Sequence, residues 1–352
     1  MIHKRLPVAI LGATGAVGQR MVQLLADHPW FEIAVLTGSD RTIGRPYGEL
    51  VRWILDTPIP ERVAKMIVQP TEAVADVAIA LSALPTDVAR EAEPLWAART
   101  AVCSNASAYR AVADVPLIIP EVNPDQLALI ERQRAGRGWQ GCLVTNPNCA
   151  TISAVMPLKP LHDAFGLQKA HISTLQAVSG AGYPGVASLD IIDNIIPNIA
   201  DGGEEAKIES EPRKLLGRVV EGQVIEAQIA ISAQVTRVPI IDGHTALIAA
   251  SFAQKPSPEE ALAVLEAFTP PEIVRHLPSS PERALIVHRV GDRPQPRRDR
   301  DAGRGMSASV GRVRACPVLD LRMVALSHNT IRGAAGGAIL NAELLVASGI
   351  VS

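Results

Sequence analysis

Short apolar runs alternate with amphipathic stretches through the first part of the chain. The run LPVAIL at residues 6–11 ends at a glycine, and a helical pattern follows over residues 17–26. Further strand-like runs lie at residues 33–36, 77–81, 101–103 and 117–119. Because strands that alternate with helices form βαβ units, this pattern predicts an α/β domain built on a parallel sheet.

The pattern changes after residue 148. A helix predicted over residues 150–165 precedes longer strands at 169–178, 228–238 and 245–252, and another helix at 256–267 begins with the sequence SPEE. These elements indicate an α+β domain with a mixed or antiparallel sheet. The small-residue-rich stretch 333–347 is expected to form a helix that returns to the first domain. We therefore predict one domain over residues 1–148, completed by 328–352, and a second over 149–327.

Composition and charge limit the class of protein. With 47% hydrophobic and 20% charged residues and a formal net charge of -2, the chain is typical of a globular protein without a general attraction to nucleic acid or anionic membranes. No apolar stretch approaches the roughly 20 residues that cross a bilayer, and the N-terminus has no signal-peptide pattern. Residues 293–304 interleave opposite charges without aromatic residues, so we expect a solvated or salt-bridged loop there.

The sequence GATGAVG at residues 12–18 follows the first strand and opens the first helix. Glycines in this position let the backbone approach a pyrophosphate, and the helix N-terminus offers free N–H groups to it. The motif predicts a Rossmann-type dinucleotide-binding domain. The residues expected to contact the cofactor here are Gly12, Thr14, Gly15, Ala16, Val17 and Gly18.

The end of the second strand indicates which dinucleotide is bound. Ser39, Arg41 and Thr42 can surround the 2'-phosphate of NADP, so we predict NADP as the cofactor. Asp40 leaves NAD as the alternative, because an acidic residue here accepts hydrogen bonds from a ribose 2'-hydroxyl.

Cys149 lies in NPNCAT, where a loop becomes a helix. A thiol at a helix N-terminus is expected to have a lowered pKa, because the helix dipole and free amides stabilise the thiolate. We predict that Cys149 is a nucleophile. The four cysteines have no metal-binding spacing, which indicates reduced thiols, a cytoplasmic location and no metal site. Cys103, Cys142 and Cys316 are expected to be inert buried residues.

The segment RVPIIDGH at residues 237–244 is expected to end one strand and start the next. Arg237 and His244 then lie near each other across a short connection. Histidine suits general acid–base catalysis near neutral pH, and arginine binds a carboxylate with two parallel hydrogen bonds.

Five longer strings together resemble the archaeal and fungal-like branch of the aspartate-semialdehyde dehydrogenases. They are NPNCAT, LQAVSGAGYPG, RVPIIDGH, RPQPRRDRDAGRGMS and LSHNTIRGAAGGAILNAELL, and the resemblance spans nearly the whole chain. It implies reversible reduction of L-aspartyl 4-phosphate to L-aspartate 4-semialdehyde through a cysteine thioester, in lysine, threonine and methionine biosynthesis. It also implies a homodimer or homotetramer formed through the second domain.

The resemblance assigns roles to individual residues. Cys149 would be the nucleophile and His244 the acid–base catalyst, and Gln176 would orient the acyl intermediate. Arg237 would bind the substrate carboxylate, and Glu204, or its neighbour Glu205, the ammonium group. The remaining implied contacts are Lys207 and Arg110 with phosphate, Ser179 and Gly180 with the reacting group, and Ser82, Ala83, Leu84, Asn105, Gly182 and Asn329 with the cofactor.

Two alternatives remain at this point. A malonyl-CoA reductase has a similar architecture, but it needs room for coenzyme A and has no use for a glutamate that binds an ammonium group. The presence of Glu204 and Lys207 therefore favours aspartate semialdehyde as the substrate. A non-catalytic dinucleotide-binding paralogue is disfavoured, because Cys149, Gln176, Arg237 and His244 are all present.

Overall fold

The first sheet is entirely parallel. A computed structural model describes residues 5–352 and gives this sheet the strand order β3-β2-β1-β4-β5-β6. Its strands are β1 (Leu6–Leu11), β2 (Phe31–Gly38), β3 (Gln69–Pro70), β4 (Ile79–Ser82), β5 (Ala101–Ser104) and β6 (Cys142–Thr145). The order reverses next to β1, so the carboxyl ends of β1 and β4 open a crevice at which ligands bind in such sheets.

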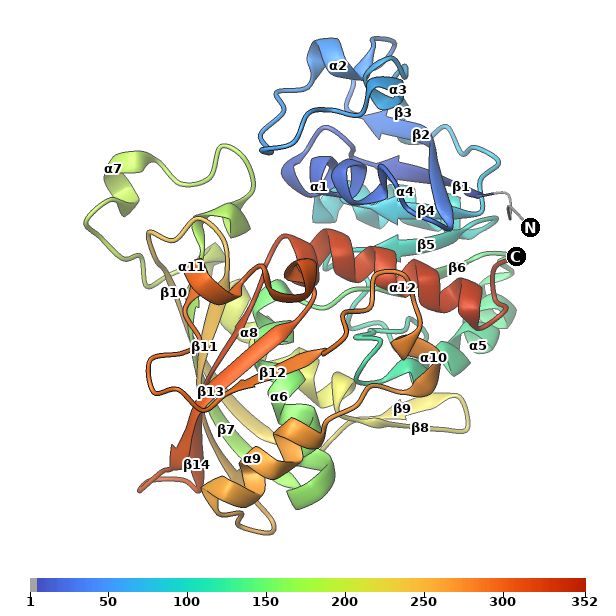
Figure 1. Cartoon of the computed structure of the whole chain (residues 1–352). Helices are drawn as coiled ribbons and strands as arrows, with labels where there is room; N and C mark the ends of the chain where they lie inside the picture. Colours follow the sequence, from blue (N-terminus) through green and yellow to red (C-terminus); the bar gives the residue numbers. More distant parts are fainter. Residues whose placement is uncertain (1–4) are drawn as a thin grey trace.

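Helices cover both faces of this sheet because its strand residues are apolar on both sides. Val8 and Ile10 of β1 pack in one core with α1 (Ala16–Leu25), whereas Ala9 and Leu11 pack in another with α4 (Thr86–Ala97). Three shorter helices, α2 (Tyr47–Leu50), α3 (Glu61–Ala64) and α5 (Leu129–Arg137), complete this part of the chain. The C-terminal helix α12 (Gly336–Ala347) returns to the same sheet, as predicted, and contributes Ile339 and Leu340 to the core with α1 (Figure 1).

The second sheet is mixed, with the order β10-β7-β11-β14-β13-β12. Its strands are β7 (Leu167–Gln176), β10 (Ala230–Arg237), β11 (His244–Phe252), β12 (Leu285–His288), β13 (Ala308–Ala315) and β14 (Leu321–Ser327). One face packs on α6 (Cys149–Phe165), α8 (Gly203–Leu215) and α9 (Pro258–Ala267) (Figure 1). The small elements α7 (Ser188–Ile191), β8 (Arg218–Val220), β9 (Gln223–Ile225), α10 (Glu272–Arg275) and α11 (Pro296–Asp299) lie in its connections.

The predicted fold class is confirmed, but several elements differ. Residues 117–119 do not form a strand, because their one ladder contact is an isolated parallel bridge from Leu117 to Thr145. That partner belongs to β6, a strand that the apolar pattern did not reveal. Strands β12, β13 and β14 and helices α4, α5 and α8 were not predicted either. The 293–304 segment contains the expected salt bridge, Arg293 with Asp299, but it forms short helical turns and buries that aspartate.

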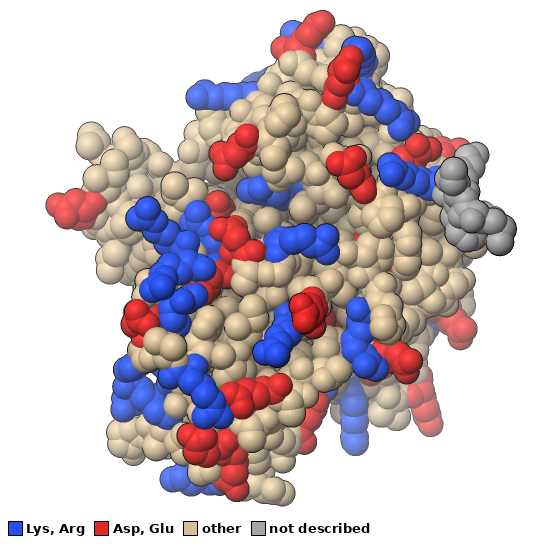
Figure 2. Space-filling model, viewed as in Figure 1, with Lys and Arg blue, Asp and Glu red and all other residues tan. Residues whose placement is uncertain are grey.

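Charged side chains of both signs are intermingled over the face of the molecule that Figure 2 displays. Arginines form local ion pairs with nearby acids, as Arg289 does with Glu259 and Glu266. None of the helices in residues 5–352 is both long and apolar enough to span a membrane.

Candidate active site

A cavity of about 720 Å³ lies where the carboxyl ends of the first sheet meet helices α6 and α8. Most of the sequence-predicted site residues line it. They are Thr14, Gly15, Ala16, Val17, Ala83, Leu84, Asn105, Arg110, Cys149, Ser179, Gly180, Gly182, Lys207 and Asn329. Residues from distant parts of the chain therefore share one cavity, which places the predicted nucleophile beside the glycine-rich turn.

The glycine-rich turn leaves the N-terminus of α1 open to this cavity. Gly12 has a φ of +75°, which L side chains rarely adopt. Gly18 gives close packing, because a Cβ there would lie 2.3 Å from the Gly12 carbonyl oxygen. Gly15 is the N-cap of α1 and has no side chain to accept from the first-turn amides, so those N–H groups are available to a ligand.

Six of the predicted cofactor residues lie off the cavity wall, namely Gly12 and Gly18 of the glycine-rich turn and Ser39, Arg41, Thr42 and Ser82. Ser39 and Arg41 are exposed at the end of β2, and Thr42 donates its hydroxyl hydrogen to the Ser39 carbonyl oxygen at 2.7 Å. Ser82 is fully buried at the end of β4, and its carbonyl oxygen accepts from Asn105 Nδ2 at 3.1 Å. Ser82 therefore positions a cavity residue and does not face the cavity itself.

Cys149 is the first residue of α6. Asn148 is the N-cap of this helix, and its Oδ1 accepts from the amides of Ala150 at 2.9 Å and Thr151 at 3.3 Å. Behind the thiol, Gly333 comes so close that a Cβ there would lie 2.7 Å from the Cys149 Cβ. The nucleophile is thus fixed by a capped helix end on one side and a close backbone contact on the other.

The expected lowering of the Cys149 pKa is contradicted. Burial raises the pKa of the thiol to about 12, and the negative charge of Glu204 acts in the same direction. Arg110, Arg237 and the Ala150 amide act in the opposite direction but are outweighed. The thiol faces the cavity yet lies deep in the protein, where an isolated thiolate is poorly solvated. In the free protein Cys149 is therefore a neutral thiol at neutral pH.

The other cysteines agree with the prediction in two of three cases. Cys103 and Cys142 are buried in the first sheet. Cys316 is only half-buried, and its Sγ accepts from the Leu319 amide at 3.4 Å. That hydrogen bond, with one from the Val318 amide, lowers the pKa of the Cys316 thiol.

Helix α8 presents a row of alternating charges to the loop before Cys149. Glu204, Lys207, Glu211 and Lys214 are spaced at intervals that bring them to one face of a helix. Glu204 Oε1 accepts from Lys207 Nζ at 2.7 Å, and its Oε2 accepts from Asn148 Nδ2 at 2.8 Å. Burial opposes ionisation of Glu204, but these hydrogen bonds outweigh it and lower its pKa. Glu205, the alternative to Glu204, instead accepts from the Val235 amide of β10.

Arg110 approaches the same loop from the first part of the chain. Its Nη1 donates to Glu211 Oε1 at 2.9 Å and its Nη2 to the Asn105 carbonyl oxygen at 2.6 Å. Its Nε is buried and has no hydrogen-bond partner within residues 5–352. A partly satisfied guanidinium on the cavity wall, near Lys207, is suited to binding an anion.

Arg237 and His244 are brought together as predicted, by the backbone of Ala177. The Ala177 carbonyl oxygen accepts from Arg237 Nη1 at 2.8 Å, and its amide donates to His244 Nδ1 at 3.0 Å. Gly180 lies against both side chains, since a Cβ there would be 2.7 Å from Arg237 Nη1 and 3.0 Å from His244 Cε1. A side chain at position 180 would therefore press against both Arg237 and His244.

The Ala177 hydrogen bond also fixes the tautomer of His244. Because Nδ1 accepts from an amide, the neutral ring carries its proton on Nε2, which is buried without a partner in residues 5–352. Burial, aided by the charge of Arg237, lowers the pKa of His244 to about 3. The imidazole is therefore neutral at physiological pH and has a hydrogen-bond donor available at Nε2.

Gln176 and Asn329 complete the predicted set. Gln176 is buried at the end of β7, in register with Arg237 of β10. Asn329 accepts from the Gly243 amide at 2.8 Å and donates to Ser179 Oγ at 2.8 Å. Asn329 thereby connects the start of the His244 strand to the loop that contains Ser179 and Gly180.

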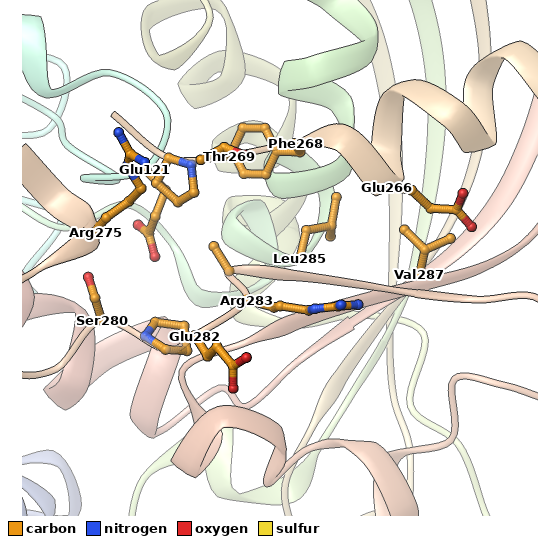
Figure 3. A pocket seen from close by; sticks show the side chains of 13 residues that line it. Glu121, Glu266, Phe268, Thr269, Arg275, Ser280, Glu282, Arg283, Leu285 and Val287 are labelled. Carbon is orange, nitrogen blue, oxygen red and sulfur yellow. The ribbon is translucent and has the colours of Figure 1, made fainter. Parts of the chain in front are cut away.

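A second cavity, of about 660 Å³, lies beside α9 and β12 (Figure 3). It is lined by Glu121, Arg275 and Arg283 among others, and it contains none of the sequence-predicted site residues. The Glu121 carboxylate also pairs with the buried Arg332. We assign the active site to the cavity that contains Cys149, because a nucleophile and an open helix N-terminus meet there.

The capping role expected of Asn148 at the helix of Cys149 is observed, but sequence reasoning missed two residues that organise this site, namely Glu211 and Ala177. The pattern ExxKxxxExxK at residues 204–214 places four charges on one face of a helix, but the same spacing is typical of a solvated helix face and does not reveal that Glu211 is buried. Ala177 acts through its backbone, so its residue type carries no signal either.

Comparison with known proteins agrees with this geometry. A family model described as the semialdehyde dehydrogenase NAD binding domain matches residues 7–130, and one described as the semialdehyde dehydrogenase dimerisation domain matches residues 158–332. The aspartate-semialdehyde dehydrogenase of Archaeoglobus fulgidus is 51% identical, over 99% of this chain and 100% of its own length. This chain belongs to the aspartate-semialdehyde dehydrogenase family. The resemblance to the archaeal and fungal-like branch is thereby confirmed.

Solved structures of the family have the same fold. The crystal structure of aspartate semialdehyde dehydrogenase with NADP from Candida albicans has a TM-score of 0.89 and 40% identity, and covers 99% of this chain and 100% of its own. Aspartate semialdehyde dehydrogenase II complexed with ASA from Vibrio cholerae has a TM-score of 0.76 and 27% identity, and covers 97% of this chain and 98% of its own. These proteins are relatives with which the cavity can be compared.

Proposed function

We propose that this chain catalyses the reversible NADP-dependent reductive dephosphorylation of L-aspartyl 4-phosphate to L-aspartate 4-semialdehyde, in the biosynthesis of lysine, threonine and methionine. The observation that carries the proposal is the meeting of Cys149 and the open N-terminus of α1 on one cavity. Family membership and the relatives' names support the substrate. A Candida albicans relative was solved with NADP and a Vibrio cholerae relative with ASA.

The first turn of α1 fits a dinucleotide pyrophosphate. Its amides are left uncapped by Gly15, and Thr14, Ala16 and Val17 line the cavity next to them. Bound NADPH would supply the hydride for the reduction. Ala83, Leu84 and Asn105, at the ends of β4 and β5, and Asn329 would complete the contacts to it.

Arg110 and Lys207 line the cavity, and Arg237 and Glu204 lie directly behind its wall residues Gly180 and Asn148. The charges of these four groups match the charges of the substrate. Arg237 would bind the α-carboxylate and Glu204 the ammonium group, while Arg110 and Lys207 would bind the phosphate. Glu204 is ionised because its pKa is lowered, as binding an ammonium group requires. Coenzyme A has no such ammonium group, which favours aspartyl phosphate over malonyl-CoA.

Cys149 would attack the acyl carbon of aspartyl phosphate. The S–C bond forms as the C–O bond to phosphate breaks, and the thiol proton leaves with the phosphate in the overall balance, giving a thioester and hydrogen phosphate. After hydride addition the carbonyl oxygen carries negative charge, and the Nε2–H of neutral His244 would stabilise it. Breaking the C–S bond then releases the semialdehyde, and the thiolate takes up a proton.

The test is the initial rate of NADPH formation from aspartate 4-semialdehyde and NADP, with and without inorganic phosphate, beside a Cys149→Ala control. Phosphate-dependent turnover that is absent in the control is the expected result. Turnover with malonyl-CoA and NADPH in place of aspartate semialdehyde would reassign the substrate. Activity that persists in Cys149→Ala would remove the nucleophile from the proposal.

The family model of a dimerisation domain over residues 158–332 supports a homo-oligomer. We propose a homodimer or homotetramer formed through the second sheet, whose outer face exposes Leu247. Size-exclusion chromatography with light scattering measures the number of subunits, and a monomer at micromolar concentration would contradict the proposal.

A further inference from the structure

We propose that Glu211 is a positioning residue that couples the phosphate-binding Arg110 to the segment that carries Cys149. This inference rests on the proposed function, since it takes Arg110 as a phosphate ligand. Glu211 itself lies off the cavity wall and touches neither substrate nor cofactor in this arrangement. It acts through the two groups that it holds.

The two oxygens of the Glu211 carboxylate have different partners. Oε1 accepts from Arg110 Nη1 at 2.9 Å, and Oε2 accepts from the backbone amide of Asn148 at 2.7 Å. Glu211 is buried, with 6% of its side chain exposed. The carboxylate therefore bridges a residue of the first part of the chain and the residue directly before the nucleophile, away from competing water.

Neighbouring groups on α8 make this bridge rigid. Glu204 holds the side chain of Asn148 at 2.8 Å, so α8 contacts Asn148 through both its backbone and its side chain. Lys214 Nζ donates to the carbonyl oxygens of Arg110, Val112 and Val115 at 2.7 to 2.9 Å. Helix α8 thus fixes the Arg110 segment and the Cys149 loop relative to one another.

The bridge requires a carboxylate. A glutamine at position 211 has one acceptor oxygen and one donor amide, so it can accept from Arg110 or from Asn148 but not from both. Its amide would face the N–H group that remains, and a buried donor would be left without an acceptor. Glu211→Gln therefore keeps the shape of the side chain while it breaks the connection.

The relative positions of Arg110 and Cys149 matter because phosphate bound by Arg110 must reach the thioester on Cys149. In the direction that forms aspartyl phosphate, phosphate held by Arg110 attacks the acyl group on Cys149, and the new C–O bond forms as the C–S bond breaks. The distance between the two is set by the chain Arg110, Glu211, Asn148 and Cys149. A displacement of about 1 Å in such a geometry costs roughly a hundredfold in rate.

The test compares Glu211→Gln with Glu209→Gln. Glu209 lies on the same helix and also accepts one backbone amide, that of Ala233 at 2.9 Å, but it contacts neither Arg110 nor Asn148. In NADPH formation, Glu211→Gln should raise KM for phosphate and lower kcat, each about tenfold or more, with KM for aspartate semialdehyde changed less than about twofold. Glu209→Gln should leave all three near the wild-type values.

A second readout needs neither substrate nor cofactor. Alkylation of Cys149 by iodoacetamide should be changed by at least about threefold in Glu211→Gln relative to Glu209→Gln, because the loop before the thiol loses an anchor. If wild-type protein shows no phosphate-dependent turnover, the proposed function fails, and this comparison still decides the positioning role. Equal alkylation rates and an equal KM for phosphate in the two variants overturn the inference.

A double variant covers the case in which Glu211→Gln does not fold. Removing both partners, as Arg110→Gln with Glu211→Gln, leaves no unpaired buried charge and should fold. If Glu211 acts through Arg110, the double variant has about the same KM for phosphate as Arg110→Gln alone. A KM for phosphate in the double variant well above that of Arg110→Gln alone would contradict the coupling.

Discussion

Helices α1 and α6 both follow a strand of the parallel sheet and both begin at the wall of the same cavity, yet their first turns are completed in opposite ways. The N-cap of α1 is Gly15, which leaves the first amides free. The N-cap of α6 is Asn148, whose side chain occupies those amides and is itself held by Glu204. The open end is suited to binding a phosphate group, whereas the closed end holds Cys149 in a fixed position.

The comparison shows that a helix N-terminus does not by itself activate a thiol. At α6 the amides are used by Asn148, and the charge of Glu204 and the depth of burial raise the pKa of Cys149. Cys149 is thus a neutral thiol in the free protein.

The largest expected effect concerns the charge state of Cys149. In a Cys316→Ser background, which removes the half-buried thiol, alkylation of Cys149 should rise about tenfold per pH unit, or about a thousandfold from pH 7 to pH 10. This follows because a pKa of about 12 lies above the whole range, so the thiolate fraction grows with each unit. Iodoacetamide kinetics followed by mass spectrometry measure it, with Cys149→Ser, Cys316→Ser as the blank. If the alkylation rate instead reached a plateau below pH 9, the N-terminus of α6 would lower the pKa of Cys149 by more than burial raises it.

The next largest effect is expected from a substitution at Gly180, which lines the same cavity as Cys149. Gly180→Ala should lower kcat/KM about a hundredfold, because its Cβ would lie 2.7 Å from Arg237 Nη1 and displace Arg237 and His244. Steady-state kinetics measure this loss. Gly136→Ala on α5 is the matched control, since a Cβ there has no heavy atom within 4 Å. Equal kinetics for the two variants would show that Gly180 does not confine these side chains.

A cap introduced at the uncapped N-terminus of α1 should weaken cofactor binding without lowering stability. Gly15→Asp would cap α1 and bring a negative charge to the pyrophosphate position, so KM for NADPH should rise about tenfold or more while the melting temperature does not fall. Space is available, as the nearest atom to a Cβ at Gly15 is the Gly12 carbonyl oxygen at 3.6 Å. Gly15→Ala separates the charge from the added methyl group. An unchanged KM in Gly15→Asp would place the pyrophosphate elsewhere.

Removal of the N-cap of α6 should give the smallest effect, which is a modest loss of stability. Asn148→Ala removes the cap of α6 and should lower the free energy of unfolding by about 1 kcal/mol. Urea denaturation measures the change, and Ser257→Ala, which removes the capping box of α9 far from the cavity, provides a comparison. A loss of stability in Ser257→Ala but none in Asn148→Ala would show that Glu204 and Glu211 hold the loop without the cap.

Prediction from sequence worked best where the evidence is local. The glycine-rich turn after β1, the position of Cys149 at the start of α6, and the proximity of Arg237 and His244 were all predicted from spacing and residue type. Prediction failed for elements whose hydrophobic residues show no clear helical or strand period. Strand β6 is a four-residue buried run, and α8 carries its charges on the face that packs against the site. In the usual amphipathic helix the charged face is exposed to solvent, so a helix that buries charged side chains is not recognised from its hydrophobic pattern.

The sequence by itself determined which chemical groups this protein has and the order in which they occur: a glycine-rich turn, a thiol, an imidazole and a set of charged side chains. The tertiary structure decided their states and partners. Whether Cys149 is a thiol or a thiolate depends on desolvation by everything packed around it, and the partners of Glu211 lie about a hundred and about sixty residues away. Such long-range contacts leave no local pattern, because each depends on how two distant segments pack together.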